Sequence, residues 1–210
     1  MTSDTSHGCV EAVPWPAAAQ DAVASRLLEF ASDGAPDVAA HMDRTARLAR
    51  ALIDDLDLCD PLAQQIVLTA RLHDIGKLGI PPWILEKPSP LTEYELGVMQ
   101  EHSVIGQQML ERSPELLAVA SHVRATHERW DGDGYPDRLS GAEIPLPARI
   151  VAVCDAFDAM TKPRVYSASM SIDSALHELE RCSGSQFDPG VVAVFRGLFK
   201  SRFDRWAKRA

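Results

Sequence analysis

The 210-residue sequence has no long hydrophobic run and no excess of positive charge. No apolar stretch approaches the roughly 18 residues that a membrane-spanning helix needs, so we expect neither a transmembrane segment nor a membrane partner. Acidic residues number 30 and basic residues 21, which gives a formal net charge of −9. That balance argues against a protein whose surface is built to bind a nucleic-acid polymer. A small anionic ligand stays possible, because metal ions and a few local cations can reverse the field inside a site.

Cysteine is scarce and scattered, and the N-terminal residues do not show the basic, apolar and small-residue succession of a secretion signal. The four cysteines, at positions 9, 59, 154 and 182, lack the paired spacing of thiolate metal sites. We therefore expect reduced thiols and a cytoplasmic protein.

Strand-like alternation of apolar and polar residues is also absent, and no internal repeat is present. The sequence predicts an all-α fold, a compact helical bundle. We divide it into a flexible leader over residues 1–16, an N-terminal helix over residues 17–34 and one domain over residues 35–205. Within the domain, caps and i, i+4 apolar spacing predict helices. They are expected at about 37–56, from Asp60-Pro61, from the Thr92–Glu95 capping box, from Ser113-Pro114 to near His127, from Pro145–Pro147, and around 172–179 and 191–206. The proline-rich segment 80–90 is expected to be irregular.

A histidine and an aspartate stand side by side at His73-Asp74, and Lys77 follows after a glycine. A neutral imidazole and a carboxylate are both good ligands for a divalent metal, and the two oxygens of Asp74 could bridge two ions. Lys77 is a compact charge suited to a phosphate oxygen. Taken alone, such a pair is more often a surface or capping pair.

Six possible ligands fall on separate predicted helices or helix ends: His41, His73, Asp74, His102, His127 and Asp155. A single inward histidine would be an ordinary core residue, but so many of them together favour a metal centre. Imidazole and carboxylate ligands without thiolates indicate iron, manganese or a similar ion, with zinc as an alternative.

The helix expected from Ala148 to Thr161 is largely apolar, yet it carries Asp155 and Asp158. A buried carboxylate needs a strong partner to stay charged. A metal ion supplies such a partner, although an arginine such as Arg149 could serve one of the two carboxylates.

The segment Asp131–Pro136 has the composition of a turn. Because it follows His127 closely, it can instead form a wall of the metal pocket. Tyr135 would then offer a hydroxyl and an aromatic face to a nucleotide.

His73–Lys77 and Asp131–Pro136 together resemble the HD-GYP family, a branch of the HD phosphohydrolase superfamily. The resemblance covers roughly residues 41–199. Further matches, in chain order, are Ile80-Pro81, Ile84–Pro88, Glu101-His102 with Gly106, Ile144–Leu146, Ala148–Val153, Asp155–Thr161, Gly184 and Phe187–Pro189.

This resemblance implies an HD-domain helical fold with two or three metal ions, often iron or manganese; we expect two. It implies a phosphodiesterase that hydrolyses cyclic di-GMP to pGpG, in some members on to GMP, by attack of a metal-bound hydroxide on phosphorus. Carried over by position, the metal ligands are the six residues above, with Asp74 as the bridge. Asp74 and Lys77 take catalytic roles, and the substrate-binding residues are Lys77, Gly134, Tyr135, Pro136 and Arg164. A cyclic di-GMP synthase or an upstream sensor protein is the implied protein partner.

Several positions depart from the family pattern. Thr126 stands where the family has another ligand histidine, and Asp37 replaces a glutamate that serves a third ion. Val165 and Ser167 replace a proline and a basic residue. These losses leave open a catalytically impaired protein that only binds a nucleotide or a partner. A phosphohydrolase of another nucleotide is a third hypothesis, against which the Gly-Tyr-Pro loop argues. His122 is expected at the surface.

Overall fold

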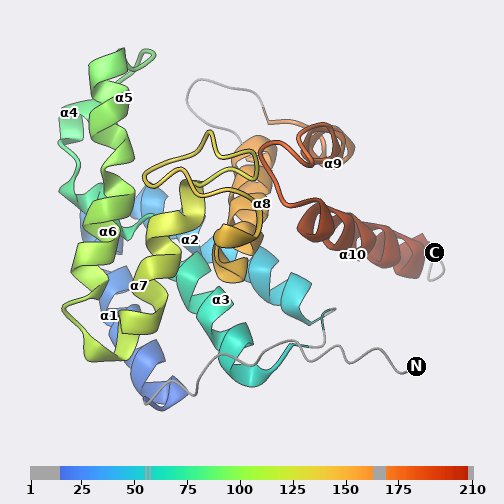
Figure 1. The fold of residues 1–210 in the computed structure, drawn as a ribbon, viewed down its shortest axis with the longest axis horizontal. Coiled ribbons are helices and arrows are strands. Elements are labelled where there is room, and N and C mark those ends of the chain that lie inside the picture. Colours follow the sequence, from blue (N-terminus) through green and yellow to red (C-terminus); the bar gives the residue numbers. More distant parts are fainter. Residues whose placement is uncertain (1–14, 55, 57, 163–168, 208–210) are drawn as a thin grey trace.

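The computed structural model describes residues 15–54, 56, 58–162 and 169–207, with side chains given as far as Phe199. Within these residues the chain is helical and contains no strand, which confirms the predicted all-α fold (Figure 1). The elements are α1 (Ala17–Gly34), α2 (Pro36–Ile53), α3 (Asp60–Leu72), η1 (Ile75–Gly79), α4 (Pro82–Leu85), α5 (Glu93–Gln100), α6 (His102–Leu110), η2 (Pro114–Leu116), α7 (Leu117–Arg124), η3 (Ala125–His127), η4 (Gly141–Glu143), α8 (Leu146–Thr161), α9 (Ile172–Arg181) and α10 (Pro189–Ala207).

Most helix starts lie where local sequence signals predicted them. The capping box at the start of α5 is present, because Glu95 N donates to Thr92 Oγ1 and Thr92 N donates to Glu95 Oε2. The expectation of a wholly irregular segment 80–90 was wrong. Pro82 occupies the first turn of the short helix α4, a position where its missing N–H costs nothing.

Among the described residues the core forms three apolar clusters, a small one of Ala125, Ile144 and Ala148 and two larger ones that meet along α3. One cluster joins α3 to α2, α8, α9 and α10, and includes Leu52, Ile66 and Phe195. The other joins α3 to α1, α6 and α7, and includes Leu68 and Leu72. Figure 1 shows α3 and α8 in the middle of the molecule, with α9 and α10 on one side and α1, α6 and α7 on the other. The C-terminal end of α3, which carries the His-Asp pair, therefore lies between the two larger clusters.

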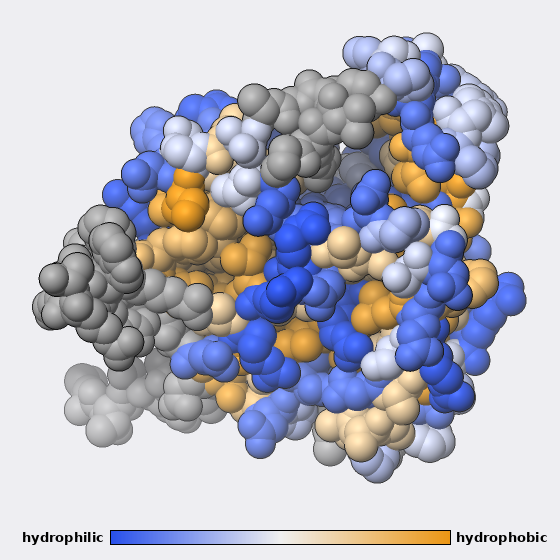
Figure 2. Space-filling model, turned by 180° about the vertical axis from the view of Figure 1, so that it is seen from behind, coloured by the Kyte–Doolittle hydropathy of each residue, from blue (hydrophilic) through white to orange (hydrophobic). Residues whose placement is uncertain are grey.

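Helix α1 is held against α3 by polar as well as apolar contacts. Ala24 and Ala31 are fully buried, and Arg71 donates to Asp21 Oδ1 and Ser25 Oγ. The face seen in Figure 2 mixes hydrophilic and apolar side chains, as an acidic globular surface does. Among the helices within the described ranges, none is long and apolar enough to cross a membrane.

Gly76 sets how closely the His-Asp turn approaches α6. A Cβ atom at this position would lie 1.9 Å from the carbonyl oxygen of His102 and 2.5 Å from the backbone nitrogen of Gly106. Only a residue without a side chain allows η1 to lie against the N-terminal turn of α6. The glycine of the His-Asp-Ile-Gly-Lys motif thus places His102 beside His73 and Asp74.

We expect Gly76→Ala to lower the free energy of unfolding by about 1–3 kcal/mol or more, because the contacting atoms are backbone and cannot move aside. Gly97→Ala is the matched control, since a Cβ atom there meets nothing within 4 Å. Urea unfolding of the two variants checks this. Equal stability of the two variants would contradict the account.

Candidate metal centre

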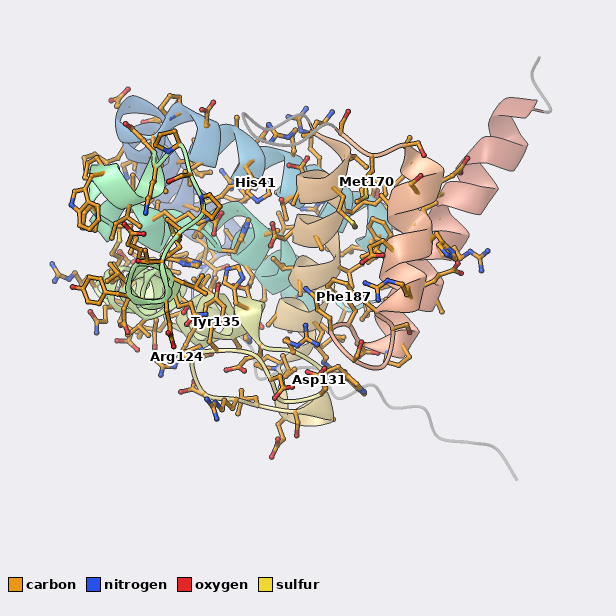
Figure 3. The ribbon with its side chains drawn as sticks, turned by 90° about the horizontal axis from the view of Figure 1, so that it is seen from above. His41, Arg124, Asp131, Tyr135, Met170 and Phe187 are labelled. Carbon is orange, nitrogen blue, oxygen red and sulfur yellow. The ribbon has the colours of Figure 1, made fainter. Side chains whose placement is uncertain are left out.

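The six predicted ligands come from five parts of the fold and lie together. His41 is on α2, His73 and Asp74 follow α3, and His102 begins α6. His127 ends η3, and Asp155 is on α8. They form two groups whose ligand atoms lie within 4.8 Å of one another: His41, His73 and Asp155 in the first group, and Asp74, His102 and His127 in the second group. Figure 3 shows His41 on α2 close to α8.

Asp74 belongs to both groups by geometry. Its Oδ2 atom lies 3.5 Å from His73 Nε2 and 3.8 Å from His41 Nε2. Its Oδ1 atom lies 3.4 Å from His102 Nε2 and 3.8 Å from His127 Nε2. Each oxygen of one buried carboxylate therefore faces one of the two groups.

The donor atoms fit divalent ions. Within the described residues, His73 Nε2 and Asp74 Oδ1 are buried without a hydrogen-bond partner, an arrangement that costs free energy unless something binds there. In the second group, His102 Nε2 and His127 Nε2 are only 2.8 Å apart. The donor set is nitrogen and oxygen only, which suits iron, manganese or zinc.

Hydrogen bonds at Nδ1 turn the Nε2 atoms of three histidines toward the centre. His73 Nδ1 donates to Ala70 O at 2.9 Å, and His102 Nδ1 donates to Met99 O at 2.6 Å. His41 Nδ1 instead bonds to a side chain, Asp158 Oδ2, at 2.7 Å. Such bonds fix the tautomer and the orientation of a ligating imidazole.

The partner of Asp158 differs from the one expected. Arg44, on α2, donates to both oxygens of Asp158 through Nε at 2.8 Å and Nη2 at 2.9 Å. Arg149 lies elsewhere and donates to Asp188 Oδ2 at 2.7 Å. The expectation that Arg149 could serve a carboxylate of the centre was therefore wrong, since Arg149 is near the start of α8 and Asp158 is more than two turns further along the helix.

Burial and charge act against each other on the ionisable groups of the centre. Burial alone would raise the pKa of Asp74, but the Lys77 ammonium and the adjacent His73 hold it well below its usual range. Burial alone would lower the pKa of His41, but hydrogen bonds to Asp155 and Asp158 outweigh it and raise the pKa to about 9. Burial and the nearby His127 lower the pKa of His102 to about 4. The centre thus holds ionised carboxylates beside a neutral His102.

Lys77 connects the centre to an open cleft. Its ammonium donates to Asp74 Oδ2 at 2.6 Å, and its side chain is 24% exposed. The cleft has a volume of about 670 Å³, and Arg44 and Lys162 also line it. The same cleft is lined by Asp37, Asp74 and Asp158, so cations and carboxylates alternate on the His41 side of the centre.

The Gly-Tyr-Pro loop borders the other side. The Tyr135 ring stacks on His127 with centroids 5.1 Å apart and planes within 7°. Tyr135 and Asp155 both line a second cleft of about 270 Å³. A Cβ atom on Gly134 would lie 2.3 Å from the Arg129 backbone nitrogen, so this glycine is required by packing. Pro136 lines an adjoining cleft of about 530 Å³ with Gly134 and Tyr135.

Comparison with known proteins identifies the family. The model of the HD domain family matches residues 25–191. The chain belongs to the HD-domain family. It is 40% identical over 166 residues to a cyclic di-GMP phosphodiesterase of Thermotoga maritima, covering 78% of this chain and 45% of that protein. It is 39% identical over 160 residues to the 3'3'-cGAMP-specific phosphodiesterase 2 of Vibrio cholerae, covering 75% of this chain and 31% of that protein.

Solved structures agree with the fold. An HD-GYP protein from Bdellovibrio bacteriovorus superimposes with a TM-score of 0.65 at 17% identity, over 88% of this chain and 65% of that one. The family model and the curated relatives, rather than this likeness of fold, confirm the predicted resemblance. The chain spans less than half the length of the two relatives named above.

Some predicted positions of this HD-domain chain lie apart from the centre or outside the described residues. Outside the described residues lie Arg164, Val165 and Ser167. Asp37 lines the cleft with Lys77 but belongs to neither group of ligand atoms. His122 was expected at the surface, but it is half-buried, and burial lowers its pKa to about 4.

Glu128 supports the candidate site in a way that the sequence did not predict. It is 4% exposed, and its two oxygens accept hydrogen bonds from Asp137 N at 2.7 Å and Leu139 N at 3.1 Å. It thereby anchors the far side of the loop that carries Tyr135. A carboxylate directly after a ligand histidine was the available signal, but its targets are backbone amides that no sequence pattern reveals.

We expect Glu128→Gln to lower the hydrogen-exchange protection of the Asp137 and Leu139 amides at least about tenfold, because a carboxamide offers one acceptor where the carboxylate offers two. Exchange followed by NMR measures this. Glu143→Gln is the control, because Glu143 is an exposed residue of the same loop that bonds only within its own turn. Unchanged protection in Glu128→Gln would show that other contacts hold the loop.

Proposed function

We propose that the chain is a metal-dependent phosphodiesterase that hydrolyses the cyclic dinucleotide cyclic di-GMP to linear pGpG. The observation that carries this proposal is the buried Asp74, whose two oxygens face two separate groups of ligand atoms. Its similarity to proteins named as phosphodiesterases of cyclic dinucleotides supports the same class of substrate. The end product is GMP if a second hydrolysis follows.

Two divalent ions are proposed, iron or manganese. One would be held by His41, His73, Asp155 and Asp74 Oδ2, and the other by His102, His127 and Asp74 Oδ1. Ions bound there supply positive charge that polarises phosphoryl oxygens and acidifies water.

Lys77 is proposed to bind the phosphate group. Lys77 presents a mobile ammonium to the cleft, where it can meet a phosphoryl oxygen that gains charge during the reaction. Asp74, which now bonds Lys77, is the group that keeps this ammonium at the centre. A serine or cysteine nucleophile is not needed, and burial raises the pKa of the Cys154 thiol beside Asp155, so this thiol is uncharged.

A cyclic dinucleotide has two nucleosides, and open clefts lie on both sides of the centre. The cleft with Lys77 and His41 borders one side, and the cleft with Tyr135 and Asp155 borders the other. Burial raises the pKa of Tyr135, so its hydroxyl stays protonated and can donate to a phosphate or ribose oxygen. Gly134 and Pro136 shape this wall, and Arg164 is proposed as a further phosphate contact.

We also propose a cytoplasmic location and a protein partner, either a cyclic di-GMP synthase or an upstream sensor protein. An acidic chain with local cations around one centre fits a small anionic ligand rather than a nucleic-acid polymer.

Thr126 favours a second candidate function, a binding module with weak or no turnover. Its hydroxyl donates to Val123 O at 2.9 Å, and its side chain is 2% exposed. The second group therefore has three ligand residues, Asp74, His102 and His127, and lacks the additional imidazole that the family resemblance implies. Tight nucleotide binding without hydrolysis would be the result of a weakly held second ion.

The direct test is turnover of cyclic di-GMP by the purified chain loaded with Mn²⁺ or Fe²⁺, with the linear product identified by mass spectrometry. We expect Asp74→Asn to lower kcat/KM by more than about a hundredfold, because metal-dependent stabilisation of several kcal/mol is lost. Asp173→Asn, at the exposed start of α9, is the control and should leave turnover unchanged. A metal-loaded protein that leaves cyclic di-GMP intact would contradict the proposal, and 3'3'-cGAMP assayed in parallel detects a different dinucleotide preference.

We expect Thr126→His to tighten binding of one ion about tenfold or more and to raise turnover, because it adds an imidazole beside His127. Calorimetric titration with Mn²⁺ measures the affinity. If affinity and turnover both stay as in the natural sequence, Thr126 is not the limiting feature and the binding-module alternative loses its support.

A further inference from the structure

His41 differs from the other oriented histidines in what holds it. His73 and His102 each bond through Nδ1 to a carbonyl oxygen three residues earlier in their own helical segment. Their orientation is therefore set locally by the backbone. His41 is held by two carboxylates of α8: Asp158 Oδ2 bonds Nδ1 at 2.7 Å, and Asp155 Oδ1 bonds Nε2 at 2.8 Å. Since Nε2 and Asp155 are themselves proposed to hold an ion, the bond from Nδ1 to Asp158 is the one that remains to orient the ring when the ion is bound. Its orientation depends on a side chain that must itself be held in place.

Asp158 needs hydrogen-bond partners to keep its carboxylate charged in its buried position. It is 2% exposed and lies on the buried face of an apolar helix, where an unpaired carboxylate would be strongly disfavoured. Its Oδ2 atom bonds His41 Nδ1, and Arg44 donates to Oδ1 and Oδ2 together. Asp158 belongs to neither group of ligand atoms, so it acts through His41.

Arg44 can hold the Asp158 carboxylate in place because it lies on the same helix as His41. The two residues are three positions apart on α2, so their side chains leave the same face of the helix. The planar guanidinium donates to both carboxylate oxygens, a geometry that a lysine ammonium cannot reproduce. The Arg44 side chain is 32% exposed and reaches Asp158 from the cleft side.

We propose that Arg44 is a positioning residue for metal binding: through Asp158 it fixes the ring of His41 so that Nε2 faces His73 and Asp155. This inference rests on the proposed metal-dependent function. It predicts an asymmetric effect, because His102 and His127 in the second group have no link to Arg44. Loss of the Arg44 side chain lowers the affinity for the ion held by His41, His73 and Asp155. The affinity for the other ion stays unchanged.

The test is calorimetric titration of the metal-free protein with Mn²⁺, which reads binding rather than activity. We expect Arg44→Met to weaken one of two binding events about 10- to 100-fold and to leave the other unchanged. Arg44→Lys should give an intermediate loss, since it keeps the charge and only one of the bonds.

Arg149→Met is the matched control. Arg149 also joins α8 to a buried carboxylate, Asp188, by one short ion pair, but it lies outside the centre. Wild-type Mn²⁺ affinity in Arg149→Met, together with loss in Arg44→Met, supports the assignment. Unchanged affinity for both ions in Arg44→Met, or an equal loss in Arg149→Met, would overturn it.

The same titration separates this inference from the proposed function. If the natural chain binds two ions but does not hydrolyse cyclic di-GMP, the proposed reaction fails while the Arg44 variants still decide the positioning role. If the natural chain binds no Mn²⁺, both proposals fall. If Arg44→Met does not fold, the loss of affinity in Arg44→Lys decides the matter, and wild-type affinity there overturns the inference.

Discussion

One buried carboxylate, Asp74, is the constraint on which the rest of the structure depends. It is 1% exposed, yet the Lys77 ammonium and the adjacent His73 keep its pKa well below the usual range. A charge in such a place needs partners: Lys77 bonds Oδ2, whereas Oδ1 faces the imidazoles of α6 and η3 without a hydrogen-bond partner. The two larger apolar clusters meet along α3, which fixes where this carboxylate lies. The end of α3 is therefore both the place where the two larger apolar clusters meet and the place of the candidate bridging carboxylate.

The candidate ligands of the two groups are supported by different means, and this follows from the fold. His73 and His102 take their hydrogen-bond partners from their own helical segments, so that helix formation alone orients them. His41 is oriented across the interface between α2 and α8, and His127 stacks on a tyrosine from the loop that Glu128 anchors. The first pair is oriented by secondary structure. The second pair depends on tertiary contacts, and substitutions remote from the ligands act through these contacts.

The helices and the identity of the six candidate ligands could be predicted from the sequence, because caps and apolar spacing are local signals and the motifs resemble a known family. The role of the six as metal ligands stays a prediction. The partner of Asp158 could not be predicted, since Arg44 is 114 residues away and Arg149 is closer in sequence. The short helix α4 was missed because prolines can begin a helix as well as break one. Glu128 was missed because it binds backbone amides, which carry no sequence signature.

The central claim is that one carboxylate serves two ions. Anomalous diffraction from crystals of the Mn²⁺-loaded protein tests it most directly, because manganese positions are then located independently of the protein atoms. The account predicts two manganese ions, one bound by Asp74 Oδ1 with His102 and His127, and one bound by Asp74 Oδ2 in the group that contains His41. A single ion, or two ions of which one does not touch Asp74, would contradict it.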